Sequence, residues 1–221
     1  CHTNRKNKRD KSLSVNIDTG LAYCHYCNWK FNARMHEEKK QFAPAVPPQP
    51  AVLKNEHVEW FIKKRNIPAS VLMEAGITSA DEFMPQTGRK ESCICFNYYD
   101  GNRLVNTKFR VQEKHFKMTA GAELIPYNLN GILGTPQCII TEGEIDALSF
   151  MAIGRTDVIS VPSGANCNLS WLDRFVKSHF DDKQVIYLCV DTDKKGLQLR
   201  DELLRRLGAE RCLIVDLSPA K

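Results

Sequence analysis

The sequence predicts an α/β protein in which two smaller parts precede a parallel sheet, and three observations indicate this fold. From residue 136 onward, apolar strand-like runs alternate with helix-like segments, which is typical of a parallel sheet covered by helices. In the middle of the chain a hairpin signal joins two strand-like runs and indicates a mixed α+β segment. Near the start, a Cys-x-x-Cys turn follows a short hairpin pattern, which indicates a β zinc ribbon.

Residues 1–33 form the predicted ribbon. The stretch 12–17 alternates like a strand, residues 18–20 carry a hairpin signal, and residues 21–24 return as a second strand. A hairpin of this size cannot bury enough apolar surface to fold by itself, so we expect a metal ion to stabilise it.

Residues 34–52 are predicted to be a linker. They are charged at first and then rich in Pro and Ala, a composition that favours an extended chain. We expect this linker to let the ribbon move relative to the rest of the protein.

Residues 53–135 are predicted to form a mixed α+β subdomain. Two helix faces are marked by apolar side chains, the first by Val58, Phe61 and Ile62 and the second by Val71, Leu72 and Ala75 ahead of Gly76. Strands are expected at 93–99 and 103–112 around the turn 100–102, with a third run at 115–118.

This subdomain also carries a group of basic side chains on and near its second strand. Lys108 and Arg110 share the parity of that strand, so they should lie on one face of the sheet. Arg103 and Lys117 flank them in the sequence.

Residues 136–221 are predicted to form the parallel-sheet domain. Its expected elements, in order, are strand 137–141, helix 144–153, strand 157–161, helix 168–179, strand 184–190, helix 195–207 and strand 211–217. The loops at the carboxyl ends of such strands build the site.

Charge and cysteine usage narrow the setting. Residues 1–40 hold nine Lys/Arg against four Asp/Glu, which accounts for the whole net charge of +5, and a basic block joined to a metal module suits phosphate contacts. The nine cysteines lack the spacing of a secreted disulfide framework, so we expect an intracellular protein with reduced thiols. No run of 18 apolar residues predicts a membrane span.

Acidic residues follow two of the predicted strands. Glu142 comes directly after the first strand of the sheet, and Asp191 and Asp193 follow the third, 49 residues later. One Asp would suffice as a helix N-cap, whereas two in this position need a cation to tolerate each other. Oxygen ligands without His or Cys suit Mg²⁺ or Mn²⁺, which indicates phosphoryl chemistry. For Glu144 and Asp146, a role as acids in the first turn of a helix fits nearly as well as a role in the site, so Glu142 ranks above them.

Cys24 and Cys27 form one half of a tetrahedral zinc site. Cys1 is the third candidate ligand. The fourth is open between His2, His25 and a Cys upstream of residue 1, and the last explains the pattern best because adjacent ligands strain the geometry. We therefore expect the chain to be a fragment at its N-terminus.

These motifs together resemble the DNA primases of bacteria and phages, most of all the primase half of phage-type primase–helicases. Residues 141–148 look like the first acidic motif of the Toprim domain, and residues 190–196 look like its D-x-D motif. The ribbon is similar to the primase zinc-binding domain, and residues 106–110 are similar to the basic patch that precedes Toprim in primases.

The resemblance implies an activity and a role for each matching residue. It implies template-directed synthesis of short RNA primers on single-stranded DNA from ribonucleoside triphosphates, with Mg²⁺ (or Mn²⁺) and Zn²⁺ as cofactors. Glu142, Asp191 and Asp193 match the catalytic, magnesium-binding acids, and Cys1, Cys24 and Cys27 match zinc ligands. Lys108 and Arg110 match nucleotide- and template-binding residues, to which Lys117 and Arg103 are added, while Tyr26 and Trp29 are expected to read template bases.

Two departures from the family pattern and two other functions stay open. One zinc-ligating Cys and the family's further acid, expected just beyond residue 221, are absent, so we expect truncation at both ends. A non-catalytic ribbon protein that binds single-stranded DNA, or a Toprim-type nuclease, would share these motifs. A replicative helicase, fused or separate, is the expected partner, in the cytoplasm of a bacterial or phage-infected cell and without a membrane.

Overall fold

The fold was analysed in a computed structural model that describes residues 12–16, 21–32, 42, 52–111, 114–165 and 168–216. The chain divides into two compact units, Cys1–Gln41 and Phe42–Lys221, and each is treated by itself. Within the described residues, no helix combines the length and the apolar character needed to cross a membrane.

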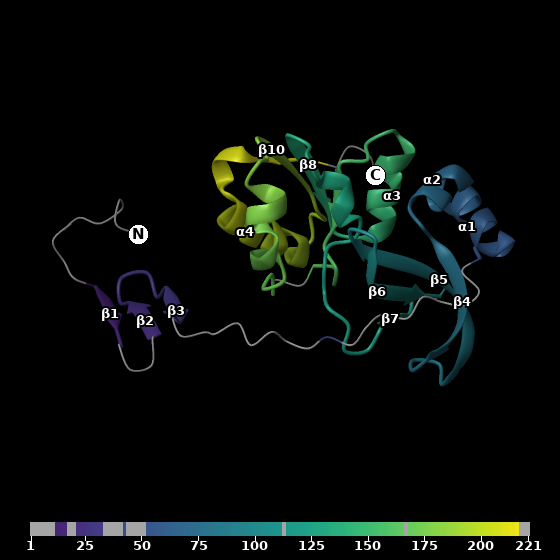
Figure 1. The fold of residues 1–221 in the computed structure, drawn as a ribbon, viewed down its shortest axis with the longest axis horizontal. Helices are drawn as coiled ribbons and strands as arrows, with labels where there is room; N and C mark the ends of the chain where they lie inside the picture. Colours follow the sequence, from purple (N-terminus) through teal and green to yellow (C-terminus); the bar gives the residue numbers. More distant parts are fainter. Residues whose placement is uncertain are drawn as a thin grey trace. The chain divides into compact units, whose positions relative to one another are not determined.

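The first unit contains a small antiparallel sheet in the order β1-β2-β3 (Figure 1). Strand β1 (Leu13–Val15) pairs with β2 (Leu21–Cys24) with Leu13 opposite Cys24, as the alternation in the sequence predicts. Strand β3 (Lys30–Asn32) was not predicted, because its three residues carry too little pattern. The predicted turn at 18–20 lies outside the described residues. The antiparallel sheet expected of the ribbon is therefore present.

The second unit opens with two helices that pack on an antiparallel sheet. Helix α1 (Asn55–Arg65) buries His57 and Phe61, and α2 (Ala69–Glu74) buries Val71 and Leu72. Ile62, predicted on the buried face of the first helix, is 46% exposed. The buried stripe of α1 is therefore turned toward its polar histidine, which an apolar pattern does not reveal.

The antiparallel sheet has the order β4-β5-β6-β7. Its strands are β4 (Thr78–Met84), β5 (Arg89–Asp100), β6 (Arg103–Arg110) and β7 (Phe116–Met118). Strand β4 was missed in the sequence because its residues TSADEFM are mostly polar. The predicted hairpin turn falls where expected, and Asp100 faces Arg103 across it.

This sheet is strongly curled, because its two edge strands approach each other. Lys117 Nζ on β7 lies 2.8 Å from Glu82 Oε2 on β4, although two strands separate them in the sheet order. Gln86 Nε2, just beyond β4, likewise donates to the Phe116 carbonyl oxygen at 2.8 Å. The enclosed face holds a second, small core made of Met84, Cys93, Cys95, Phe109 and Val111.

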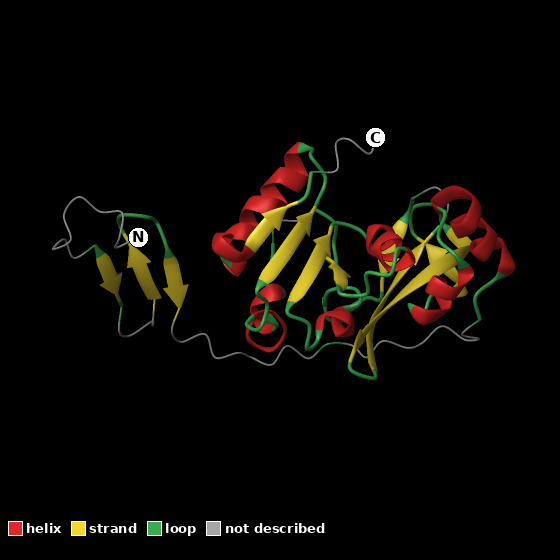
Figure 2. Cartoon of the chain, turned by 90° about the horizontal axis from the view of Figure 1, so that it is seen from above, coloured by secondary structure: helices red, strands yellow, loops and turns green. Residues whose placement is uncertain are grey.

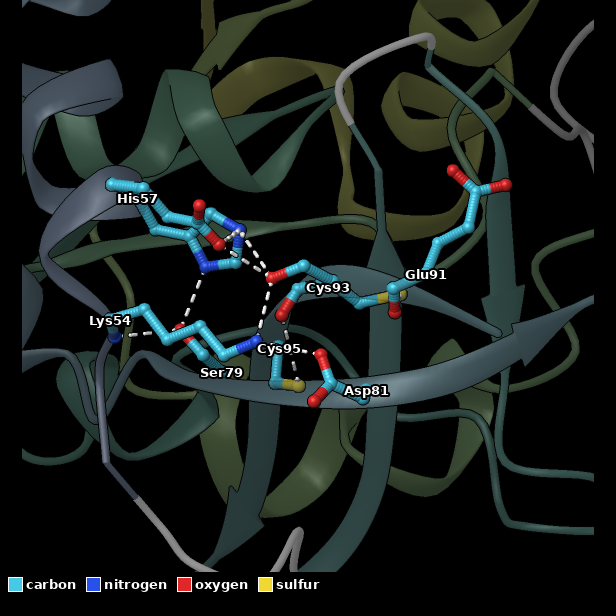
Figure 3. A network of polar contacts seen from close by, with 9 residues as sticks. Lys54, His57, Ser79, Asp81, Glu91, Cys93 and Cys95 are labelled. Atoms are coloured by element: carbon cyan, nitrogen blue, oxygen red, sulfur yellow. Dashed lines mark hydrogen bonds and ion pairs between the residues drawn. The ribbon is translucent and has the colours of Figure 1, made fainter. Parts of the chain in front are cut away.

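A polar network joins the start of α1 to this sheet (Figure 3). Ser79 on β4 contacts His57 Nδ1 at 2.7 Å and accepts the Lys54 backbone N–H at 2.9 Å, while Lys54 Nζ donates to Asp81 at 2.6 Å. Burial lowers the pKa of His57, so the imidazole is neutral at physiological pH. The network fixes the point at which the second unit begins.

The parallel sheet has the order β11-β10-β8-β9, and all its pairings are parallel (Figure 2). Its strands are β8 (Gln137–Thr141), β9 (Val158–Ser160), β10 (Val185–Cys189) and β11 (Cys212–Ile214), with α3 (Glu144–Ala152) and α4 (Lys194–Leu207) as crossover helices. The sequence alternation predicted these six elements.

The helix predicted at 168–179 is wrong. The segment forms a 3₁₀ turn at Leu172–Arg174 and a π turn at Val176–Phe180. Its buried apolar residues are Leu169, Trp171, Leu172, Phe175 and Phe180. A spacing of three residues is found in α-helices and in 3₁₀ turns, so this pattern did not distinguish the two.

One hydrophobic core spans the helices, the antiparallel sheet and the parallel sheet of the second unit. Tyr127 belongs to this core, and its ring packs edge-on against the rings of Phe96 and Tyr98, with centroids 6.0 and 5.4 Å apart. Its backbone N–H donates to the Ser160 carbonyl at the edge of β9 at 3.0 Å. The two sheets therefore share their packing and should unfold together.

We predict that Tyr127→Ala lowers the free energy of unfolding by about 3–5 kcal/mol, because it removes a fully buried ring. Urea unfolding followed by circular dichroism should show one transition at a lower midpoint. The matched control is Phe83→Ala, which truncates a ring 49% exposed and should change stability by less than about 0.5 kcal/mol. Separate transitions for the two sheets would contradict a shared core.

Candidate functional site

The carboxyl ends of β8 and β10 lie side by side at the point where the strand order reverses. From β8 the chain moves to β9 on one side and then to β10 on the other. Thr141 pairs with Cys189 in the last rung, so Glu142 and Asp191 emerge just beyond the same end. In open α/β sheets, ligands bind outside the strand ends at such a switch point. The sequence-predicted acids are therefore brought to one sheet edge.

Glu142 and Asp191 are in direct contact. The Asp191 backbone N–H donates to Glu142 Oε2 at 3.4 Å. Burial raises the pKa of Glu142, and the charges of Asp191 and Asp193 raise it further, against the backbone N–H groups of Asp191 and Ala165. Burial and the neighbouring acids thus disfavour the ionised form of Glu142, and a nearby cation would favour it.

Asp193 is the N-cap of α4, since its Oδ1 accepts the Gly196 N–H at 2.8 Å. This is the role that a single Asp was expected to fill, and it leaves the second carboxylate oxygen uncommitted to the cap. Gly196 is required here, because a Cβ would lie 2.1 Å from the Asp191 carbonyl oxygen. The first turn of α4 is therefore packed directly against the backbone of Asp191.

Asp146, ranked low in the sequence, belongs to the same edge. Desolvation by the surrounding chain raises its pKa, and the Asp191 charge adds to this. The Asp146 residue is exposed to solvent at this edge. The signal that could have identified it is its position one turn into the helix that follows Glu142.

These acids suit magnesium in their chemistry and placement. Mg²⁺ binds carboxylate oxygens and keeps several waters, so an open, solvent-facing edge with carboxylates from two strands fits it. Among the described residues, no three His, Cys, Asp or Glu side chains already converge tightly enough to hold a metal ion. The arrangement is therefore an acidic edge and not a closed cage.

Glu144 differs from its acidic neighbours because it is buried and fully engaged. Lys108 Nζ lies 2.8 Å from Glu144 Oε1 and 3.0 Å from Oε2, and the Tyr98 hydroxyl also donates to Oε1. Burial raises the pKa of Tyr98 well above its ordinary value, and the Glu144 charge raises it further. Lys108, predicted to bind nucleotides, is thus tied to the first acidic motif.

Arg110 shares its sheet face with Lys108, as parity predicted, and lies over an aromatic ring. Its guanidinium is 4.6 Å from the Trp60 ring centroid, and that of Arg65 is 5.5 Å from the same ring. Burial, followed by the Arg65 charge, lowers the pKa of Arg110. Within the described chain its buried Nη1 has no hydrogen-bond partner. Trp60 and Arg65 were missed, because nothing in a helix pattern indicates which strand it will meet.

The other two predicted basic residues lie apart from this pair. Lys117 is bound to Glu82 and lies over the Phe109 ring at 5.1 Å. Arg103, at the β5–β6 turn, faces Asp100 at 3.5 Å and Glu123 at 3.9 Å. Both are engaged by acids in the second unit.

In the ribbon, Cys24 and Cys27 lie together at the turn after β2. Backbone N–H groups of Cys27 and Tyr26, together with the neighbouring Cys27 thiol, lower the pKa of Cys24 to about 6. A thiolate stabilised in this way is what a zinc ion requires. Cys1 lies outside the described residues. His25 Nε2 contacts Ser14 Oγ at 2.9 Å, and Tyr26 and Trp29 are 54% and 48% exposed.

The acidic edge and its sheet correspond to a known family. Residues 139–221 match the family model described as Toprim-like. The parallel sheet with acids at its switch point is thus a Toprim-like domain, as the sequence predicted.

The chain also resembles DNA primases beyond that domain. It is 33% identical over 140 residues to the primase homolog protein of Arabidopsis thaliana, covering 57% of this chain and 41% of that protein. The primase fragment of the bacteriophage T7 primase–helicase protein has the same fold, with a TM-score of 0.62, 22% identity, and coverage of 93% of this chain and 84% of that one.

A second solved structure also has a similar fold. The primase domains bound to an RNA/DNA hybrid and dTTP beside the bacteriophage T7 lagging-strand DNA polymerase match with a TM-score of 0.60 and 25% identity, covering 69% of this chain and 76% of that one. The resemblance to DNA primases is thereby confirmed, and this chain corresponds to about two fifths of its Arabidopsis relative.

We predict that Asp146→Asn raises the melting temperature of the metal-free protein at pH 7 by about 2 °C or more, because it removes one of several repelling charges. The raised pKa means that ionised Asp146 destabilises the fold above that pKa, and that this penalty disappears below the ordinary value of 3.8. The gain should therefore vanish near pH 3. Differential scanning calorimetry with and without 10 mM Mg²⁺ tests this.

Magnesium should raise the melting temperature of the wild type more than that of Asp146→Asn. Asp181→Asn, on the exposed turn before β10, is the matched control and should leave the magnesium response unchanged. An equal response of the wild type and Asp146→Asn would exclude Asp146 from the metal edge.

Proposed function

We propose that this chain is the primase part of a replication protein, which synthesises short RNA primers on a single-stranded DNA template by nucleotidyl transfer with release of pyrophosphate. The observation that carries the proposal is the junction of two surfaces: the acidic edge at the switch point, and the basic strand β6 tied to it through Lys108 and Glu144. Metal-binding acids next to fixed cations suit a nucleoside triphosphate and a growing chain.

Asp191, Asp193 and Glu142 would hold one or two Mg²⁺ ions, with Asp146 assisting. When bound, such ions lower the pKa of the primer 3′-hydroxyl and stabilise charge on the α-phosphate and the leaving pyrophosphate. The raised pKa of Glu142 in the metal-free protein supports this assignment, because carboxylates crowded together favour a cation.

The basic residues would neutralise phosphates of the nucleotides and the template. Arg110, with a buried Nη1 that has no partner among the described residues, is the best placed of them. Arg65 contacts the same Trp60 ring as Arg110 and adds a second positive charge next to it. Lys108 contributes from its place beside Glu144, and Lys117 and Arg103 would have to leave their acidic partners to take part.

The ribbon would bind Zn²⁺ through Cys1, Cys24 and Cys27 and read template bases with Tyr26 and Trp29. The lowered pKa of Cys24 next to Cys27 supports the zinc assignment. Exposed aromatic rings beside basic residues suit stacking on unpaired bases.

The proposed partners follow from the relatives. One similar fold comes from a primase–helicase protein and another from a complex with an RNA/DNA hybrid and a DNA polymerase. We therefore propose a single-stranded DNA template, ribonucleoside triphosphates and a replicative helicase, fused or separate, as partners. The proposed setting is a compartment where DNA replicates and thiols stay reduced, such as the cytoplasm of a bacterial or phage-infected cell.

We predict that zinc protects the ribbon thiols from alkylation. Iodoacetamide should modify the exposed Cys27 within minutes once EDTA has removed the metal. Cys24 is buried but, with a pKa of about 6, mostly thiolate at pH 7, so it should react next, more slowly than Cys27. Cys93 and Cys95, whose pKa values burial raises to about 11 and 12, should react only after unfolding and serve as the internal control. Peptide mass spectrometry reports each site, and labelling of Cys24 at the same rate with and without zinc would refute the zinc assignment.

We predict that the full-length protein makes labelled dinucleotides and longer primers from ribonucleoside triphosphates on single-stranded DNA with Mg²⁺. Asp191→Ala should reduce this synthesis by at least about a hundredfold, because it removes a ligand needed in the transition state. Asp157→Asn is the control, since Asp157 pairs with Arg155 at the opposite end of the sheet.

The assay also separates the two other functions. Binding of single-stranded DNA without any product would favour the non-catalytic binding protein. Strand scission in place of synthesis, abolished by the same Asp191→Ala, would favour a Toprim-type nuclease.

A further inference from the structure

We propose that Glu144 is a positioning residue that fixes the Lys108 ammonium beside the acidic edge, so that Lys108 can donate to a nucleotide phosphate. The proposal rests on the proposed function, since it assigns a nucleotide phosphate to Lys108. It gives Glu144 a role different from those of the metal-binding acids and of a helix first-turn acid.

The contact is buried and made from three elements. Lys108 comes from β6, Tyr98 from β5 and Glu144 from the first residue of α3. The side chains of Lys108 and Glu144 are only 14% and 6% exposed, and Tyr98 is fully buried. Buried carboxylates are tolerated when they are paired and hydrogen-bonded, as this one is.

The hydrogen-bond inventory leaves Lys108 one free donor. An ammonium has three N–H groups, and two of them suffice for the two oxygens of Glu144. The Lys108 Nζ also lies over the Phe116 ring, 5.3 Å from the ring centroid, which limits the other orientations of the ammonium. The third N–H is therefore available in a restricted direction.

The same inventory argues against Glu144 as a metal ligand. Oε1 accepts from both Tyr98 and Lys108, and Oε2 accepts from Lys108. A magnesium ion would have to displace an ammonium from a buried pair, at a high cost in electrostatic energy. Glu142, two residues earlier, points to Asp191 instead.

The position of the Lys108 charge relative to the metal-binding acids follows from these two roles of Glu142 and Glu144. Residues 142 to 144 place one carboxylate at the metal edge and the next one on the basic strand, separated by a single glycine. A lysine alone is a flexible four-carbon stem with a mobile charge. When Glu144 binds the Lys108 ammonium, the charge of Lys108 is held at a fixed distance from the acids that are proposed to act on the same nucleotide.

The test compares Glu144→Gln, Lys108→Met, the double variant and Tyr98→Phe in the full-length protein. Calorimetric titration with ATP and Mg²⁺ gives a dissociation constant that does not depend on synthesis, and primer synthesis gives KM and kcat. Urea midpoints check that each variant is folded, and Tyr98→Phe is the mild change should a charge variant unfold. Asp157→Asn breaks an ion pair remote from the site and serves as the matched control.

We expect Glu144→Gln and Lys108→Met each to weaken ATP binding and raise its KM about tenfold, with kcat changing less. The double variant should also lose about tenfold and not a hundredfold, because the two residues act as one unit. Tyr98→Phe should lose about two- to threefold. The Mg²⁺ concentration for half-maximal synthesis should stay within about twofold of the wild type, which a metal ligand or a merely structural residue would not produce together with this pattern.

Three results would overturn the proposal. Multiplying effects in the double variant would show independent roles. Tighter ATP binding by Glu144→Gln would show that Glu144 only masks the lysine charge. A raised Mg²⁺ requirement with unchanged ATP affinity would make Glu144 a metal ligand. A wild type that binds ATP but makes no primers would refute the proposed function alone, and the positioning role of Glu144 would then be tested by the dissociation constants. A wild type that binds no ATP would refute both proposals.

Discussion

The buried contact of the Glu144 carboxylate with Lys108 and Tyr98 is the interaction on which the arrangement of the second unit depends. It joins the antiparallel sheet to the start of α3 at the point where the acidic motif leaves β8. Around it the shared core, with Tyr127 between the two sheets, supplies the apolar burial that keeps both halves together. Apolar packing stabilises the unit, while the ion pair fixes the position of the Lys108 ammonium relative to the acidic motif that follows β8.

The acidic edge illustrates how function and stability oppose each other in this protein. Glu142 and Asp146 have raised pKa values because the chain and the neighbouring acids disfavour their charge. Such repulsion is tolerated because the rest of the unit is well packed, and a cation bound at this edge would lessen the repulsion. Asp193 lessens the conflict by also capping α4, so one residue serves the helix and the edge.

Periodic segments could be predicted from the sequence, and contacts between distant segments could not. The apolar runs of β8 and β10, each followed by a helix pattern, were sufficient to place Glu142 and Asp191 at one edge. Polar β4 and the segment ending at Phe180 were missed or misassigned, because tertiary packing overrides local pattern there. The partners of Lys108 and Arg110 lie 36 and 50 residues away in the sequence, on helices whose facing strand no local pattern reveals.

The hydrogen bonds between Tyr127 and Ser160 make the two edges of the parallel sheet different, because they occupy backbone groups at the β9 edge. At the β9 edge, the backbone N–H and carbonyl of Ser160 are already occupied by Tyr127, which follows the antiparallel sheet in the chain. At the other edge, β11 exposes Leu213 and Ile214, and among the described residues no strand lies beyond it. Any further strand, from the same polypeptide or another, can therefore be added to this sheet only next to β11. Of the two edge strands, β9 is therefore covered by the segment around Tyr127, whereas β11 is open to pairing with another strand.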